Sequence, residues 1–256
     1  MQIYVCVKHV PDTAAKITVK APNQIEEAIT FIMNPYDENA IEEAVRIKKR
    51  RGDAEVIAVT LGKPAAENTL RSALAMGADR GILILTEDPP DSLVTARALT
   101  VAIEQDGTPD IIFTGKESID NAGFQTMYRL AAALDMTVVS NVAAFALEGK
   151  RVVVECQMEG GARGVIELSL PCVIGAGKGL NKPSYPTLPA IMQARRKEVK
   201  RIALDSLRIE KPSARADILE LKPAVEARRA QQLKGSAEEV VRQLIRILRE
   251  EARVIE

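Results

Sequence analysis

Apolar runs alternate with amphipathic segments over the first 135 or so residues of the chain. Four short runs are rich in β-branched residues and predict strands: 2–8, 53–60, 80–86 and 110–114. Four segments carry apolar side chains at helical spacing: 37–50, 65–76, 91–105 and 127–134. Strands that alternate with helices predict an α/β fold with a doubly wound, mostly parallel, Rossmann-like sheet and right-handed crossovers.

The pattern changes after Leu134. Strand-like segments then follow one another with only turns between them: 137–147, 151–157, 165–170 and 172–176. We expect these segments to extend the same sheet. From Gly177 to about Lys200 the chain contains prolines and little apolar periodicity, which predicts a surface loop.

The last quarter of the chain is different again. Residues 201–235 are irregular and charged, which predicts an arm, and Ser236-Ala-Glu-Glu239 is a capping box that opens a helix over 240–251. The apolar stripe of this helix needs a surface, either the chain's own sheet domain or a partner subunit. We therefore expect a domain over 1–200, including a loop at 179–200, and an arm with a helix over 201–256.

The charges of the chain cancel. It has 35 basic and 35 acidic side chains among 256 residues, so no overall field attracts nucleic acid or anionic lipid. No apolar run approaches the roughly 20 residues of a membrane span, and Met1 to Cys6 is typical of a strand rather than a signal peptide. We expect no nucleic-acid partner, no membrane insertion and a cytoplasmic location.

The cysteines predict neither a disulfide nor a metal site. Cys6, Cys156 and Cys172 are odd in number and lie in apolar runs, so buried, reduced thiols are expected. His9 is the only histidine, and Ser118 and Ser140 have no histidine near them in the sequence. A nucleophile with its base is therefore not expected, and we predict no catalytic side chain.

The segment Gly115 to Thr126 carries the strongest chemical signal. An apolar strand ends at glycine, a small polar loop follows, and a helical pattern begins at Met127. Parallel sheets present backbone N–H groups to phosphates in this way. The segment contains neither Gly-x-Gly-x-x-Gly nor a Walker lysine motif. We interpret it as a nucleotide cradle, and the alternative is an ordinary connection with Asn121 as a helix N-cap.

Other strand ends point to the same place. Lys8-His9, Thr60-Leu61-Gly62 and Thr114-Gly115 all follow predicted parallel strands and should converge on one crevice. Two clusters of charged residues have interpretations that involve no catalysis. Four carboxylates, Asp37, Glu38, Glu42 and Glu43, indicate an acidic helix start that favours the helix dipole. The basic run 195–197 is either a solvated face or a surface that attracts acidic partners.

Four separated motifs, in order with this loop, resemble a known family. They are Val5-Cys-Val-Lys-His-Val-Pro-Asp12, Met33-Asn-Pro-Tyr-Asp-Glu-Asn-Ala40, Leu70-Arg-Ser-Ala-Leu-Ala-Met-Gly-Ala-Asp-Arg80 and Gly179-Leu-Asn-Lys-Pro-Ser-Tyr-Pro-Thr-Leu-Pro-Ala-Ile-Met192. The chain thereby resembles the β subunit of a heterodimeric electron-transfer flavoprotein over residues 1 to about 200. The last fifty residues match only in general character.

The resemblance implies an electron carrier rather than an enzyme. In this family an α subunit holds the redox-active FAD, and the β subunit binds AMP in most members or a second FAD in the electron-bifurcating ones. Partners implied for this chain are the α subunit, acyl-CoA dehydrogenases of fatty acid oxidation and a membrane quinone oxidoreductase. AMP is the nucleotide we favour, although Phe124 and Asn121-Ala122-Gly123 depart from the family pattern.

The resemblance also assigns site residues. Those implied to line the nucleotide pocket are Cys6, Asn34, Pro35, Tyr36, Asp37, Leu61, Gly115, Lys116, Glu117, Ser118, Ile119, Asp120, Asn121, Ala122, Gly123, Phe124, Gln125 and Thr126. Thr13 corresponds to the place where the family's β subunit approaches the α-subunit flavin. Those implied to dock the dehydrogenase are Tyr185, Leu188, Pro189, Ile191 and Met192, with Leu188 as the projecting anchor.

Two alternatives to this function stay open. In a bifurcating protein, NADH would reduce a FAD held in the β subunit, and a ferredoxin-linked branch would leave through that flavin. From another class, a nucleotide hydrolase or adenylating enzyme on a related fold would need a phosphate-handling motif such as Ser-Gly-Gly-x-Asp near the first strand. Lys8-His9-Val10-Pro11-Asp12 is not such a motif.

Overall fold

The structure is a computed structural model that describes residues 1–88, 90–209, 218–223 and 231–255. The chain divides into two units, Met1–Leu219 and Glu220–Glu256. Much of the predicted arm, at 210–217 and 224–230, lies outside the described residues. Within the described residues, no helix is both long enough and apolar enough to cross a membrane.

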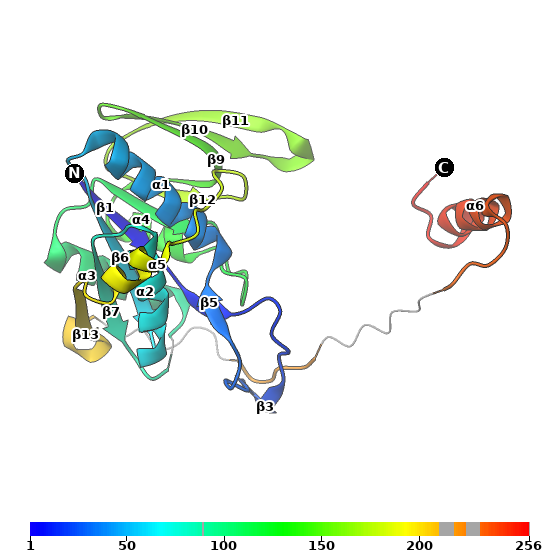
Figure 1. The fold of residues 1–256 in the computed structure, drawn as a ribbon, viewed down its shortest axis with the longest axis horizontal. Helices are drawn as coiled ribbons and strands as arrows, with labels where there is room; N and C mark the ends of the chain where they lie inside the picture. The colour runs from blue at the N-terminus through cyan, green and yellow to red at the C-terminus, as the bar shows by residue number, and fades with distance from the viewer. Residues whose placement is uncertain (89, 210–217, 224–230, 256) are drawn as a thin grey trace. The chain divides into compact units, whose positions relative to one another are not determined.

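A nine-stranded sheet forms the centre of the first unit (Figure 1). Its parallel strands, in spatial order, are β9 (Thr137–Glu148), β12 (Cys172–Ala176), β8 (Ile111–Gly115), β1 (Gln2–Cys6), β6 (Glu55–Gly62), β7 (Arg80–Leu85) and β13 (Val199–Ala203). Beyond β9, β10 (Arg151–Gln157) and β11 (Arg163–Ser169) continue the sheet antiparallel. The predicted α/β class and β extension are confirmed.

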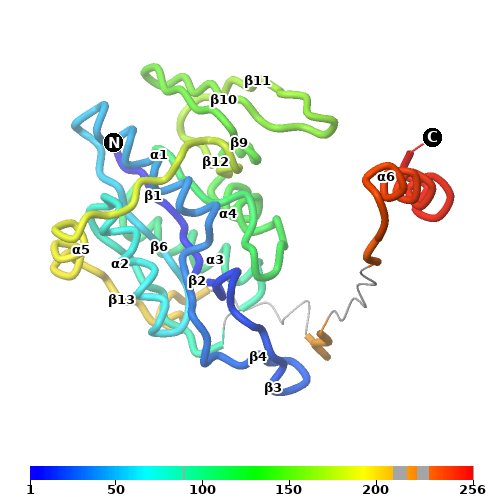
Figure 2. Tube along the Cα trace, turned by 45° about the vertical axis from the view of Figure 1, so that its right-hand side comes forward, coloured from blue at the N-terminus to red at the C-terminus, as the bar shows by residue number. Residues whose placement is uncertain are grey.

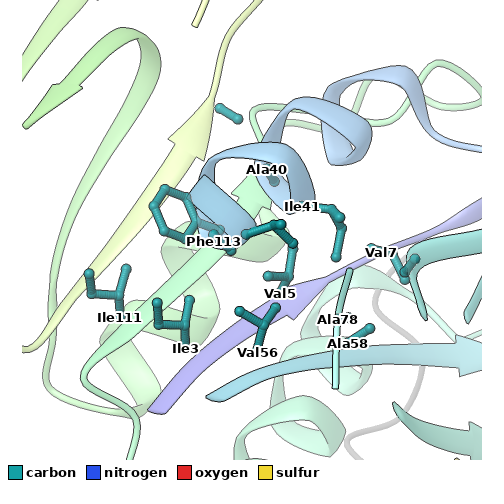
Figure 3. Close-up of a cluster of buried hydrophobic side chains, with 14 of the residues drawn as sticks. Ile3, Val5, Val7, Ala40, Ile41, Val56, Ala58, Ala78, Ile111 and Phe113 are labelled. Atoms are coloured by element: carbon teal, nitrogen blue, oxygen red, sulfur yellow. The ribbon is translucent and has the colours of Figure 1, made fainter. Parts of the chain in front are cut away.

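Helices cover both faces of this sheet. The buried side chains of α1 (Pro35–Arg51) and α2 (Glu67–Met76) share one hydrophobic cluster, which Figure 3 shows in part. Those of α3 (Ser92–Asp106) and α4 (Thr126–Ala133) share another. Strand residues alternate between the two clusters, so Ile3 and Val5 of β1 face α1 while Tyr4 lies in the α3 and α4 cluster.

Local signals fix the helix ends. Pro35 occupies the first turn of α1, where no backbone N–H is required, and α1 ends at Gly52, whose φ of 77° is left-handed. The side chain of Asp91 caps α3 by accepting hydrogen bonds from the Leu93 and Val94 N–H groups, both at 2.9 Å. A 3₁₀ turn, η1 (Pro64–Ala66), leads into α2.

Residues between β1 and α1 form short strands that the sequence pattern did not indicate. β2 (His9–Pro11) pairs antiparallel with β5 (Phe31–Met33), and β3 (Val19–Ala21) pairs with β4 (Gln24–Ile25). The β3–β4 hairpin projects away from the main sheet (Figure 2). Two or three residues are too few to show a hydrophobic period, so pattern alone cannot identify such strands.

The predictions for residues 188–203 were wrong in part. The predicted surface loop contains a helix, α5 (Leu188–Ala194), and the predicted irregular arm begins instead with the end of β13, followed by the 3₁₀ turn η3 (Leu204–Leu207). Thr187 caps α5 by accepting from the Ala190 N–H at 3.4 Å. A Thr before a first-turn proline was the signal for this helix start.

The second unit contains the predicted C-terminal helix. α6 (Ala237–Arg246) continues into a π-helical turn, η4 (Ile247–Glu251). Its capping box is confirmed, because Ser236 Oγ accepts from the Glu239 N–H at 3.4 Å and Glu239 Oε2 accepts from the Ser236 N–H at 2.8 Å. The apolar side chains Val241, Leu244 and Ile245 are exposed.

Candidate functional site

The strand order places a topological switch point between β1 and β8. From β1 the chain crosses one face of the sheet as α1 and returns as β6, which pairs with one edge of β1. Later it crosses the opposite face as α3 and returns as β8, which pairs with the other edge of β1. Ligands of open α/β sheets bind outside the carboxyl ends of the strands at such a point. Lys8 follows β1 and Gly115 ends β8, so the predicted strand ends do meet here.

A buried carboxylate joins the elements at this point. Asp37, in the first turn of α1, accepts hydrogen bonds from the Lys8 N–H at 2.7 Å, the Gly115 N–H at 2.9 Å and Asn34 Nδ2 at 2.9 Å. Asn34 in turn donates to the Glu117 carbonyl at 2.8 Å and accepts from the Ile119 N–H at 3.2 Å. The start of α1 therefore holds the end of β1, the end of β8 and the following loop together.

Gly115 is required by the close approach of α1. A Cβ atom at this residue would lie 2.3 Å from Asp37 Oδ1, 2.7 Å from Tyr36 Cβ and 3.0 Å from Asn34 Nδ2. The sequence suggested a glycine that lets a nucleotide approach the backbone. The structure shows that Gly115 makes room for α1 of the protein itself.

Charged side chains close the loop against β1. Lys8 Nζ lies 2.6 Å from Asp120 Oδ2 and 3.3 Å from Ser118 Oγ. Lys116 pairs with Glu117 at 3.2 Å and lies 5.2 Å from the centre of the Tyr36 ring. The lysine at the end of β1 is therefore bound to the loop rather than only solvated.

The end of the loop has an unusual backbone geometry. Ala122 and Phe124 have φ values of 47° and 53°, which are uncommon for residues other than glycine and occur where backbone groups are specially directed. α4 then begins without a side-chain cap. Asn121 is not its N-cap, because its Oδ1 accepts from the Gly123 N–H at 3.2 Å and the Ser118 hydroxyl at 2.9 Å.

The first turn of α4 can donate to a phosphate. The regular hydrogen bonding of α4 begins at Arg129, whose N–H donates to the Gln125 carbonyl at 3.1 Å. The N–H groups of Thr126, Met127 and Tyr128 belong to the first turn, where intrahelical partners are missing. Together with the positive end of the helix dipole, they suit an anionic group. This part of the predicted cradle fits a nucleotide phosphate.

Burial changes the protonation chemistry of the site. It raises the pKa of Asp37 to about 7, although the three N–H donors and Lys8 act in the opposite direction. Burial, together with the nearby Asp37 carboxylate, raises the pKa of the Cys6 thiol to about 12. Cys6 therefore stays a neutral thiol at physiological pH and is unsuited to act as a nucleophile. All three cysteines are free thiols; Cys156 and Cys172 are buried as predicted, whereas Cys6 is only partly buried.

The remaining predicted residues occupy different positions. Cys6 and Leu61 lie near the ends of β1 and β6. Both are partly buried against the hydrophobic cluster of α3 and α4, so they lie on the face of the sheet that α4 covers. Phe124 is exposed and its ring lies 6.0 Å from that of Tyr128. Thr13 is exposed in the segment after β2, next to a hollow of about 250 Å³ lined by Asp12, Ala14, Ala15, Ile29 and Thr30.

The predicted docking residues do form an exposed apolar group. Tyr185 is 95% exposed, Leu188 73%, Met192 52% and Ile191 41%. Leu188, Pro189, Ile191 and Met192 belong to α5, and Tyr185 precedes it. α5 packs on α2 through Ala194, which is 1% exposed.

Some charged residues have structural roles that the sequence did not indicate. Glu42 and Glu43 lie beyond the first turn of α1, so they do not contribute to an acidic helix start. Instead they bind the segment before α5, with Ser184 N–H donating to Glu42 at 3.0 Å and Asn181 Nδ2 to Glu43 at 3.1 Å. Lys197 is not part of a solvated basic face, because its Nζ donates to the Leu74 carbonyl at 2.9 Å.

His9 also has a structural environment. Its ring stacks on that of Phe31 with centroids 4.8 Å apart, and Nδ1 lies 2.8 Å from Thr69 Oγ1. Burial lowers the pKa of this histidine. These contacts fasten β2 and β5 to α2. Among the described residues, no group of three His, Cys, Asp or Glu side chains is placed to hold a metal ion.

Comparison with known proteins agrees with this architecture. The family described as Electron transfer flavoprotein domain matches residues 23–207. The chain is 34% identical, over the whole of both chains, to the electron transfer flavoprotein subunit beta of Bacillus subtilis. It is 38% identical to the human subunit beta, over 82% of this chain and 84% of that protein.

Another similar protein has a different name. The caffeyl-CoA reductase-Etf complex subunit CarD of Acetobacterium woodii is 39% identical over 76% of this chain and 75% of its own length. The family match spans most of the sheet unit, and the Bacillus subtilis match spans the C-terminal helix as well. The resemblance inferred from the separated motifs is confirmed. The chain belongs to the electron transfer flavoprotein family, as a β subunit with a role in electron transfer.

Proposed function

We propose that this chain pairs with a flavin-bearing α subunit and binds AMP at the carboxyl ends of β1 and β8. The observation that carries the proposal is the convergence of the start of α1, the loop 116–125 and the free first turn of α4 on the switch point of the sheet. This arrangement holds an adenine nucleotide through backbone groups and provides no nucleophile or base. The subunit is then a scaffold and not a catalyst.

Each part of the site has a task in this proposal. The first-turn N–H groups of Thr126, Met127 and Tyr128 bind the phosphate. Asn34 and Asp37 keep the loop in position by bonding to Ile119 and Gly115. The remaining residues implied by the resemblance, including Cys6 and Leu61, line the crevice. Bound AMP supplies no redox chemistry, and electron transfer is the work of FAD in the α subunit.

A second FAD in place of AMP is the alternative. It is favoured by the similarity to a subunit of a caffeyl-CoA reductase-Etf complex and by the motifs Cys6–Asp12 and Asn34–Asp37. In that case the protein would be electron-bifurcating and would oxidise NADH. The flavin ring would need room beyond the adenosine, whereas the N–H groups that mark the proposed site, at the start of α4, suit a phosphate.

Co-purification with the α subunit tests these two functions. The heterodimer would be denatured and its released nucleotides separated by chromatography. One FAD and one AMP per heterodimer support the proposal. Two FAD per heterodimer would replace it with the bifurcating function, and ATP turnover by the isolated chain would revive a nucleotide hydrolase or adenylating enzyme.

We also propose a docking role for the segment around α5. Tyr185, Leu188, Ile191 and Met192 expose apolar surface to solvent, and Leu188 lies at the start of a capped helix beside Pro189. Apolar side chains held in this way suit a pocket on an acyl-CoA dehydrogenase. The anchored dehydrogenase would pass electrons to the α-subunit FAD, which would deliver them to a membrane quinone oxidoreductase in fatty acid oxidation.

Two further assignments complete the proposed heterodimer. Thr13 lies in the exposed segment after β2, which would approach the flavin of the α subunit. The helix α6 exposes Val241, Leu244 and Ile245, and we assign this helix and the arm before it to docking on that subunit. Residues 201–207 of the arm expected over 201–256 are excluded, because they belong to β13 and η3. The proposed location of the complex is the cytoplasm.

A further inference from the structure

The exposed segment Tyr185–Met192 is fastened at both of its ends. On the N-terminal side, residues 181–184 are hydrogen-bonded to the middle of α1. On the C-terminal side, the end of α5 and the following turn are hydrogen-bonded to α2. Both fastenings use side chains that are buried or partly buried, whereas the apolar side chains between them are exposed.

The fastening to α1 is built from an amide pair and two carboxylates. Asn39 Nδ2 donates to the Asn181 carbonyl at 3.0 Å, and Asn181 Nδ2 donates back to the Asn39 carbonyl at 3.0 Å and to Glu43 Oε2 at 3.1 Å. Ser184 N–H donates to Glu42 Oε2 at 3.0 Å. Such reciprocal amide bonds fix both the position and the direction of the backbone.

The two carboxylates are costly to bury, and each has both a hydrogen-bond donor from the segment and an arginine partner. Glu42 is 7% exposed and Glu43 5%. Arg46 Nε lies 2.8 Å from Glu42, and Arg50 Nη2 lies 3.1 Å from Glu43. Burial alone would raise the pKa of Glu42, but the bonds from Ser184 and Arg46 hold it below its usual value. Loss of the segment would leave part of this buried charge without donors.

The fastening to α2 depends on one arginine. Arg71 Nη1 donates to the Ala194 carbonyl at 2.9 Å and to the Lys197 carbonyl at 2.7 Å, while Nη2 lies 2.8 Å from Glu67. These bonds cap the last turn of α5, which has no cap from its own side chains. Lys197 Nζ reaches back to the Leu74 and Ala78 carbonyls at 2.9 and 2.5 Å.

We propose that Asn39, Glu42 and Glu43 of α1 and Arg71 of α2 are positioning residues that hold the docking segment, residues 185–192, in one conformation before its partner arrives. The docking role of that segment rests on the function proposed above. An apolar segment that is ordered in advance loses less conformational freedom when it binds. The positioning residues touch no partner and act through the conformation of Leu188 and its neighbours.

Hydrogen exchange on the heterodimer tests the conformational part. Asn181→Ala removes the bonds that Asn181 Nδ2 donates to the Asn39 carbonyl and to Glu43, and Asn181→Asp places a carboxylate against Glu43. Both should speed exchange of the amides of residues 184–192 by roughly tenfold or more, while those of the central strands stay unchanged. Arg71→Lys should also speed exchange of these amides, because it weakens the bonds that hold the C-terminal end of the segment. Unchanged exchange in residues 184–192 for all three variants would overturn the proposal.

A double-mutant cycle tests whether this order serves docking. The measured quantities are kcat and KM for electron transfer from an acyl-CoA dehydrogenase that reduces the wild-type heterodimer. Asn181→Ala should raise KM for the heterodimer by about fivefold with little change in kcat. In a Leu188→Ala background the same change should have no further effect, because it acts through that side chain. If Asn181→Ala raises KM by the same factor in both backgrounds, it does not act through Leu188, which would contradict the positioning role.

A matched variant and the single mutants separate the possible failures. Asn68→Ala removes an exposed asparagine of α2 that lies outside both fastenings and should leave exchange and KM unchanged. If Leu188→Ala alone leaves KM unchanged, the proposed docking function fails. The exchange experiment then still decides whether these residues order the segment, because it needs no dehydrogenase.

Discussion

Single residues decide how the ends of β1 and β8 are held together. Asp37 is the most important of them, because its carboxylate, which is 5% exposed, joins the ends of β1 and β8 to Asn34 through three N–H donors. The sequence identified Asp37 as a pocket residue only through the family resemblance. No pattern along the chain could show that its partners are Lys8 and Gly115, since these contacts exist only after the strands have paired.

Asp37 should make stability depend on pH. Its folded pKa is raised from 3.8 to about 7, so the folded state holds the proton more tightly than the unfolded state. Its contribution to the free energy of unfolding is therefore complete below the unfolded pKa and is lost as the pH rises through the folded pKa. The slope is at most about 1.4 kcal/mol per pH unit.

Urea unfolding of the wild type and Asp37→Asn across this interval measures the effect. The stability of the wild type relative to the variant should decrease as the pH rises from about 4 to about 7 and become constant above about 8. Because both proteins share every other titrating group, the difference isolates Asp37. Curves that stay parallel over the whole interval would show that the carboxylate does not titrate in this window.

Two glycines of the segment between β8 and α4 should respond differently to the same change. In Gly115→Ala the new Cβ would collide with Asp37 and Tyr36, so we expect a loss of about 1–3 kcal/mol in the free energy of unfolding, typical of overpacking. Gly123→Ala is the matched control, because its nearest neighbour, Asn121 Oδ1, would lie 3.5 Å from the Cβ. Equal stability of the two variants would contradict the close approach of α1.

At the scale of elements, the prediction from sequence succeeded where a segment was long enough to show a period. The stripe Ala40, Ile41, Ala44, Val45 and Ile47 predicted α1, and all five residues are buried. It failed for β2 to β5, which are two or three residues long, and for α5 and β13. Their formation depends on tertiary partners, such as the pairing of β13 with β7, that no local pattern contains.

The docking segment supplies the prediction at this scale. Leu188→Ala should slow electron transfer from an acyl-CoA dehydrogenase by about tenfold, the size expected for loss of an interface anchor. The nucleotides and the heterodimer should stay intact. Val165→Ala is the matched control, because Val165 is 70% exposed on β11, close to the 73% of Leu188. Equal kinetics for wild type and Leu188→Ala would remove the anchor role.

The whole molecule divides its tasks between two units. The nine strands of the central sheet and both hydrophobic clusters lie within Met1–Leu219, whereas Glu220–Glu256 contains α6 and its exposed apolar stripe. The capping box predicted the helix in the second unit correctly. What that helix contacts could not be predicted, because an amphipathic stripe states only that some surface covers it.

A chain that ends at Leu219 should therefore fold. Its free energy of unfolding in urea should lie within about 0.5 kcal/mol of that of the full chain, because no buried cluster is cut. If the C-terminal helix docks on the α subunit, the shortened chain should form the heterodimer less tightly. A clear fall in the unfolding midpoint would contradict independent folding of the first unit. Unchanged affinity for the α subunit would contradict docking of the C-terminal helix on that subunit.

The central claim is that an adenine nucleotide binds at the carboxyl ends of β1 and β8. A crystal structure of the co-purified heterodimer tests it most directly, because the bound nucleotide can be located against the chain. We predict its phosphate within hydrogen-bonding distance of the N–H groups of Thr126, Met127 or Tyr128, beside the loop held by Asn34 and Asp37. A nucleotide found only elsewhere on the chain, or none bound to it, would contradict the account.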